Sequence, residues 1–131
     1  MINIGSILSR RAFLNPAREV YVDSQSGLRL TFSELNQRSN RIANSLVNRG
    51  VRPGDRVALL LMNGHEFMAC YFAIAKIGGV IVPLNWRLLS DELEFILKDS
   101  GSETLVFGEE FMETVAELHS RGDKTDLKRW I

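Results

Sequence analysis

Residues 56–84 constrain the fold more than any other stretch of the chain. Residues 57–62 form an unbroken apolar run, too short for a lone helix and without alternation, which predicts a strand buried on both faces. Residues 68–77 are apolar on almost every side, which predicts a core helix. After Gly78 and Gly79, residues 80–82 are β-branched and predict a second strand. A parallel pair joined this way crosses over right-handed, so the rest of the chain must cover the opposite face of the sheet.

Three helix starts are indicated by capping residues. Thr31 and Glu34 have the spacing of a capping box before an apolar stripe that ends near Gly50. Asn63 and Glu66 have the same spacing before the core helix, so we expect Asn63 to cap it. Ser90 precedes acidic residues and predicts a cap for a further helix running to about residue 99.

Shorter patterns complete the architecture. Side chains alternate in character over residues 19–23, residues 24–27 are typical of a turn, and residues 28–30 form the returning strand, which together predict a β-hairpin. Residues 104–107 predict a third buried strand, and residues 109–120 a last helix with Met112 inward. We therefore expect one α/β layered domain over residues 1–131, in which a mostly parallel sheet is flanked by helices and follows an N-terminal β-hairpin.

The N-terminal segment predicts a short amphipathic helix. Ile4, Ile7, Leu8 and Phe13 recur at roughly helical spacing before Pro16, which leaves Arg10 and Arg11 toward solvent. A membrane-surface role for this Arg pair is an alternative, and we favour simple solvation.

Composition excludes several classes of protein. Sixteen basic and sixteen acidic residues cancel, so no overall field attracts nucleic acid, although nine Arg against four acids make residues 1–56 basic. The apolar runs are too short to span a membrane and no signal peptide is evident, so we expect a cytoplasmic protein. The single Cys70 lies in the core helix and predicts a buried thiol.

Few residues carry an obvious chemistry. Neither standard phosphate-binding glycine motif is present, and His65 and His119 lack partners at metal-ligand spacing. Lys76, the only Lys among the first 97 residues, lies in an apolar helix and is expected to extend its ammonium group to solvent. We therefore expect no catalytic residue and no metal ligand in this chain.

Four segments in register resemble the adenylate-forming enzymes, the superfamily of acyl-CoA synthetases, luciferases and peptide-synthetase adenylation domains. They are LTFSEL (residues 30–35), GVRPGDRVALLLMN (50–63), AKIGGVIVPLNWRL (75–88) and SDELEFILKDSGSETLVF (90–107). Phe32 stands where the family usually has Tyr, and Gly79 where Ala is commoner. The match looks most like fatty-acyl-CoA ligases, and places the chain in the first part of the large N-terminal domain.

The resemblance implies a function for a longer parent protein. That family joins a carboxylic or fatty acid to CoA through an acyl-adenylate, using ATP and Mg²⁺. The phosphate loop and the other catalytic motifs of the family have no counterpart in this sequence, so we expect an N-terminal portion that is inactive alone and holds no cofactor alone. The alternatives are a free-standing binding module on the same scaffold and a fragment of a peptide-synthetase adenylation domain.

Asn85, Trp86 and Arg87 are the candidate ligand residues. They follow the second strand of the central unit, and ligands of open α/β sheets gather beyond the carboxyl ends of the strands. The resemblance implies that this loop faces the CoA nucleotide, with Arg87 on a phosphate and Trp86 on the adenine; packing against the remainder of the parent is the alternative. Because a partial domain exposes apolar surface, we also expect a homo-oligomer that uses Met68, Tyr71, Phe72 or the Trp86 loop.

Overall fold

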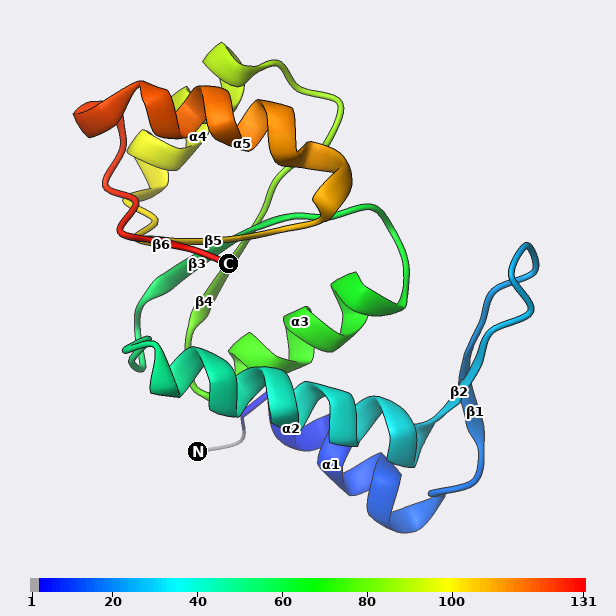
Figure 1. The fold of residues 1–131 in the computed structure, drawn as a ribbon. Helices are drawn as coiled ribbons and strands as arrows, with labels where there is room; N and C mark the ends of the chain where they lie inside the picture. The colour runs from blue at the N-terminus through cyan, green and yellow to red at the C-terminus, as the bar shows by residue number, and fades with distance from the viewer. Residues whose placement is uncertain (1–2) are drawn as a thin grey trace.

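The computed structural model describes residues 3–131 as helices layered on a parallel sheet, with a separate hairpin at one side (Figure 1). In chain order the elements are α1 (Gly5–Leu14), β1 (Glu19–Val22), β2 (Arg29–Thr31), α2 (Phe32–Asn48), β3 (Arg56–Leu60), α3 (His65–Lys76), β4 (Val80–Pro83), α4 (Ser90–Ser100), β5 (Thr104–Phe107), the 3₁₀ turn η1 (Glu109–Phe111), α5 (Met112–Ser120), the 3₁₀ turn η2 (Gly122–Lys124) and β6 (Arg129–Trp130). The hairpin, the strand–helix–strand unit and the α/β class are confirmed.

The main sheet has the strand order β4-β3-β5-β6, and every neighbouring pair is parallel. Ala58 of β3 lies opposite Val82 on one side and Leu105 on the other. Strand β3 is therefore hydrogen-bonded along both edges, as expected for the most apolar run of the sequence. Strand β6 was not predicted, because two residues are too few for any periodicity to appear.

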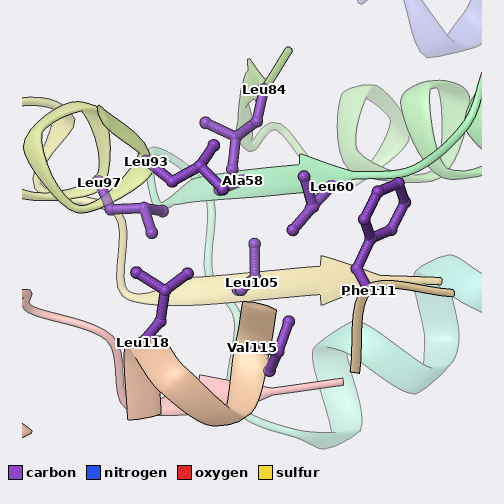
Figure 2. Packing of buried hydrophobic residues seen from close by; sticks show 9 residues of the cluster. All are labelled: Ala58, Leu60, Leu84, Leu93, Leu97, Leu105, Phe111, Val115 and Leu118. Atoms are coloured by element: carbon purple, nitrogen blue, oxygen red, sulfur yellow. The ribbon is translucent and has the colours of Figure 1, made fainter. Parts of the chain in front are cut away.

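Side chains of β3 alternate between the two faces of the sheet. Ala58 and Leu60 point into the cluster formed with α4 and α5, whose buried members are drawn in Figure 2. Val57 and Leu59 point into the cluster formed with α2 and α3. These four side chains are fully buried, so neither face of β3 meets water.

Helix α3 is covered on the side away from the sheet by α1 and α2 (Figure 1). Leu8 of α1, Leu35 of α2 and Ala69 of α3 form a third buried cluster. Met68 and Phe72 pack against it and are half-buried. Helix α3 is apolar on almost every side because the sheet covers one side of it and two helices of the same chain cover the other.

The predicted caps were right for α2 and wrong for α3. Thr31 Oγ1 accepts from the Glu34 amide at 3.2 Å, and a Glu34 carboxylate oxygen accepts from the Thr31 amide at 2.8 Å. Helix α3 begins at His65 with Gly64 as its N-cap and has no side-chain cap. The expected box fails because Asn63 lies one residue too early for its side chain to reach the first turn.

Two expectations about the last two helices are corrected. Ser90 is the first residue of α4, after Leu89 as N-cap, and its hydroxyl donates to Glu117 of α5 at 2.6 Å. Arg121 also binds Glu117 at 2.7 Å, and Asp91 of α4 at 2.7 Å, so polar contacts join the outer ends of the two helices. Met112, predicted to face inward, is exposed because the chain enters α5 through the 3₁₀ turn η1.

Lys76 does not extend into solvent as the sequence suggested. Its ammonium group donates to Ser9 Oγ at 2.7 Å, Asn36 Oδ1 at 2.6 Å and Asn40 Oδ1 at 2.8 Å. Burial lowers the pKa of Lys76, and no carboxylate within 4.0 Å offsets this among the ion pairs of residues 3–131. The Lys76 cluster, defined by these four residues, ties α1 and α2 to the end of α3.

Gly5 lets α1 approach α3 closely beside this cluster. A Cβ atom at Gly5 would lie 2.5 Å from the backbone nitrogen of Lys76. Such a contact is too short for any larger residue unless the helices separate. The hydrogen bonds of Lys76 and the close approach at Gly5 therefore hold α1 in one position.

Replacing Lys76 by Met tests the Lys76 cluster. Lys76→Met keeps the aliphatic stem and removes the donor, so the free energy of unfolding should fall by about 2 kcal/mol, as for hydrogen bonds to charged groups. Lys98→Met is the matched control, because Lys98 makes one exposed ion pair with Asp126 at 3.0 Å and should cost less than about 0.5 kcal/mol. Equal losses in urea unfolding would refute a structural role for the cluster.

Cys70 is expected to be chemically inert in the folded protein. Burial raises the pKa of its thiol to about 11, and the negative charge of Glu66 adds to the effect. Because the thiolate is the reactive form, labelling by Ellman's reagent near pH ~8 should be roughly two orders of magnitude slower than for an exposed thiol. Rapid labelling before addition of denaturant would show that the thiol is accessible.

Candidate functional site

The loops after β3 and β4 leave the same edge of the sheet in opposite directions. Strand β3 continues into α3 on one face, whereas β4 continues into α4 on the other. Where neighbouring strands of an open parallel sheet send their connections to opposite faces, a crevice forms beyond the carboxyl ends. The residues chosen from the sequence lie at this crevice.

The loop after β4 is ordered by its own hydrogen bonds. The Leu84 amide donates to the Leu59 carbonyl at 2.9 Å, which continues the sheet by one bond beyond β4. Asn85 Oδ1 accepts from the Arg87 amide at 3.0 Å, and the Asn85 carbonyl accepts from the Leu88 amide at 3.1 Å. Asn85 thereby fixes a tight turn through both its side chain and its backbone.

Trp86 and Arg87 are held against each other in this turn. Trp86 is half-buried and packs against the cluster under α4 and α5. The Arg87 guanidinium carbon lies 5.0 Å from the centroid of the Trp86 ring, within the range of a cation–π contact. Arg87 is exposed and takes part in none of the ion pairs among residues 3–131, so its donors remain open to an anion.

A cavity of about 380 Å³ lies between the two loops. Besides the three predicted residues, the lining comes from the connection after β3, from α3, and from the end of β4 with the residue that follows it. The lining residues are Leu61, Asn63, Phe67, Pro83, Leu84, Asn85, Trp86 and Arg87. We refer to it as the β3–β4 cavity. Asn63 and Phe67 were not predicted as site residues, although their position after a neighbouring parallel strand was a signal that they would lie here.

The β3–β4 cavity offers an aromatic ring, amide groups and one free guanidinium group. This set suits a ligand that carries both a planar ring and an anionic group, because Arg binds phosphate through paired N–H donors. It contains no nucleophile next to a base. None of the described residues forms a group of three or more His, Cys, Asp or Glu side chains that could hold a metal ion.

A second cavity, of about 470 Å³, lies beside α2 and α3 near the ends of β3 and β5. Arg38 Nη1 is 3.3 Å from His65 Nδ1 at its rim, and the Tyr21 ring meets the His65 ring edge to face with centroids 5.9 Å apart. Because an arginine is always a donor, His65 Nδ1 must be the acceptor. This Arg–His contact was not predicted, because 27 residues separate the two side chains along the sequence.

Comparison with known proteins identifies relatives of this chain. Residues 8–130 match the family described as AMP-binding enzyme. A long-chain-fatty-acid–CoA ligase, FadD13 of Mycobacterium tuberculosis, is 38% identical over 123 residues, which are 94% of this chain and 24% of the relative. A feruloyl-CoA synthase of Amycolatopsis sp is 44% identical over 115 residues, which are 88% of this chain and 23% of the relative.

A solved structure agrees with these matches. The N-terminal domain of FACL13 from Mycobacterium tuberculosis superimposes with a TM-score of 0.94 at 37% identity, covering 100% of this chain and 34% of that one. The chain spans about a quarter of the length of the curated relatives, 24% of FadD13 and 23% of the feruloyl-CoA synthase. Since the family match extends over nearly all of its residues, the chain belongs to the AMP-binding enzyme family.

Proposed function

We propose that this chain is the N-terminal portion of an acyl-CoA ligase that activates a carboxylic acid with ATP and transfers the acyl group to CoA. The observation that carries the proposal is the combined match, because the family covers residues 8–130 and the two relatives described above are named as a CoA ligase and a CoA synthase. The shared scaffold also has its candidate loop at the carboxyl ends of the strands, where open α/β sheets bind ligands.

The proposed role of the β3–β4 cavity is to hold the nucleotide end of CoA. CoA supplies the thiol that accepts the acyl group, and its nucleotide carries an adenine and phosphates. Asn85 keeps the turn in place, Trp86 offers a ring face to the adenine, and Arg87 offers its free donors to a phosphate. These residues fit the group by their chemistry and act by positioning.

ATP and Mg²⁺ are proposed cofactors of the whole enzyme and find no matching residues in this chain. The sequence has no glycine-rich phosphate loop, and residues 3–131 provide no group of three or more metal-ligand side chains. We therefore assign the acid-activating step to parts of the enzyme outside these residues, and to this chain the scaffold and the CoA-facing loop.

The acid is proposed to be a fatty acid. FadD13 aligns over 94% of this chain and the FACL13 domain over 100%, somewhat more than the 88% covered by the feruloyl-CoA synthase. The relatives also include a crotonobetaine/carnitine–CoA ligase of Escherichia coli, 42% identical over 108 residues, so neighbouring ligases differ in their acids. The substrate assay below distinguishes these classes.

Two expectations about the surroundings stay predictions. One is a cytoplasmic location; among the described residues, every helix is too short or too polar to cross a bilayer. The other is a homo-oligomer. Met68 and Phe72 already pack against α1 and α2, which leaves Tyr71, beside the open edge of β4, and the Trp86 loop as surfaces for it.

The chain by itself should not activate acids. Carboxylate activation needs groups that orient and neutralise the triphosphate, and this sequence supplies none. We expect no acid-dependent exchange of pyrophosphate with ATP by the purified 131-residue chain. A protein continuing it to the length of the relatives should catalyse exchange faster with long-chain fatty acids than with ferulate. Exchange by the chain alone, or no exchange with any acid by the longer protein, would contradict the proposal.

The loop is tested by replacing Arg87 in that longer protein. Arg87→Ala should raise the KM for CoA by on the order of ten-fold and leave pyrophosphate exchange nearly unchanged, because only the thioester-forming step uses CoA. Arg52→Ala is the control, since Arg52 is an exposed arginine in the turn before β3 and its side chain has no assigned contact. An equal loss in both half-reactions would indicate that Arg87 supports folding.

A further inference from the structure

The second cavity, beside α2 and α3, has an apolar floor. Ile42, Val106 and Ile131 line it and also pack against the buried cluster that contains Leu61. These three side chains are half-buried, so the cluster presents apolar surface to the cavity. The volume of about 470 Å³ lies within the roughly 300–1,000 Å³ that is usual for pockets that bind small molecules.

Two guanidinium groups lie at the rim of this cavity. Arg38 and Arg41 are three residues apart on α2, so their side chains are neighbours on the helix surface. Neither belongs to an ion pair in the part of the chain that the structure describes. Among the described residues that line the cavity, Glu66 is the one carboxylate, and it is exposed. The rim therefore carries more positive than negative charge.

His65 holds Arg38 in place at the rim. Its Nδ1 accepts from Arg38 Nη1 at 3.3 Å, and its ring meets the Tyr21 ring edge to face. Side chains of β1, α2 and α3 thus converge at one point. A guanidinium group has five N–H donors, and the contact with His65 uses one of them. Arg38 is therefore positioned before a ligand arrives, and preorganisation of this kind lowers the entropic cost of binding.

We propose that the second cavity binds an apolar carboxylate, meaning a molecule with one carboxylate group and a hydrocarbon chain. The carboxylate lies between Arg38 and Arg41, because guanidinium groups bind carboxylates through paired N–H donors. The chain extends over the apolar floor, where its burial removes hydrocarbon from water.

The lining argues against ligands of other charge. A cation would meet two guanidinium groups at the rim, and a small inorganic anion would leave the apolar floor exposed to water. A dianion such as a phosphate monoester would be repelled by Glu66 more strongly than a single carboxylate would. One negative charge on an apolar body fits the rim and the floor together.

The second cavity adjoins the proposed CoA-binding loop. Leu61 lines both cavities, and the start of α3 separates them, with His65 on one side and Asn63 and Phe67 on the other. The acid bound here is a different molecule from the one that is activated, because we assign activation to parts of the enzyme outside these residues. Binding at Arg38 and Arg41 does not depend on the acyl-CoA ligase function.

The test is isothermal titration calorimetry of the purified protein with decanoate. We expect one decanoate per chain, and octanoate should bind on the order of ten-fold more weakly, because each buried methylene contributes roughly four-fold. Decylammonium has the same chain with the opposite charge, and acetate has the head group without the chain. Each should bind at least about ten-fold more weakly than decanoate. Absence of decanoate binding, or equal binding of decanoate and decylammonium, overturns the proposal.

Two pairs of arginines provide matched variants. Arg38→Gln/Arg41→Gln should weaken decanoate binding by on the order of a hundred-fold, because each guanidinium–carboxylate contact contributes about ten-fold. Arg49→Gln/Arg52→Gln removes the same charge from exposed positions outside the cavity and should change binding less than about two-fold. Equal losses in the two pairs would reduce the effect to general attraction of anions and overturn the proposal.

Arg41→Gln alone covers the case in which loss of Arg38 disturbs the fold. The Arg41 side chain is exposed and has no assigned hydrogen bond among residues 3–131, so this variant should keep the melting temperature in circular dichroism. It should still weaken decanoate binding about ten-fold. An unchanged affinity in Arg41→Gln contradicts the proposed position of the carboxylate.

Nuclear magnetic resonance locates the bound chain. A protein of 131 residues permits isotope-filtered spectra, in which decanoate protons should show nuclear Overhauser effects to methyl groups of Ile42, Val106 and Ile131. Contacts to other parts of the surface would overturn the proposal. In a protein that continues this chain to the length of its relatives, decanoate binding should remain sensitive to Arg41→Gln. Loss of that sensitivity would assign the cavity to a later segment of the protein and also overturns the proposal.

Discussion

Burial of β3 on all sides is the constraint on which the rest of the structure depends. Hydrogen bonds to β4 and β5 occupy both of its edges, and its side chains enter a different core on each face. Since Val57, Ala58, Leu59 and Leu60 are completely buried, helices must cover both faces. Helix α3 covers one face of the sheet, and α4 with α5 covers the other. Because α3 and α4 lie on opposite faces, the loops that lead to them from β3 and β4 diverge.

The same arrangement connects the core to the candidate site and to the outer helix. Divergence of the two loops produces the β3–β4 cavity, and Asn85 fixes the turn in which Trp86 and Arg87 meet. At the opposite end of α3, Lys76 and Gly5 fix α1 with its apolar outer face exposed. Two surfaces of different chemistry are thereby positioned by the two ends of one helix.

Much of the fold was accessible from local pattern. The strand–helix–strand unit, the hairpin and the Thr31–Glu34 cap were predicted because apolar periodicity and capping chemistry act within a few residues. The site was accessible in part, since position after a parallel strand identified Asn85, Trp86 and Arg87. Asn63 and Phe67 were missed because they follow β3 and not β4, although their position after a neighbouring parallel strand was a signal.

The sequence by itself determined which segments form the longer helices and every strand except β6, that β3 lies inside, and that the chain resembles adenylate-forming enzymes. Only the tertiary structure decided which groups the Lys76 ammonium group contacts, that Arg38 lies against His65, and that β6 pairs with β5. The physical reason is range. Apolar periodicity and helix capping depend on residues a few positions away in the sequence. These contacts instead join residues that are 25 or more positions apart, and they form only when whole helices and strands pack together.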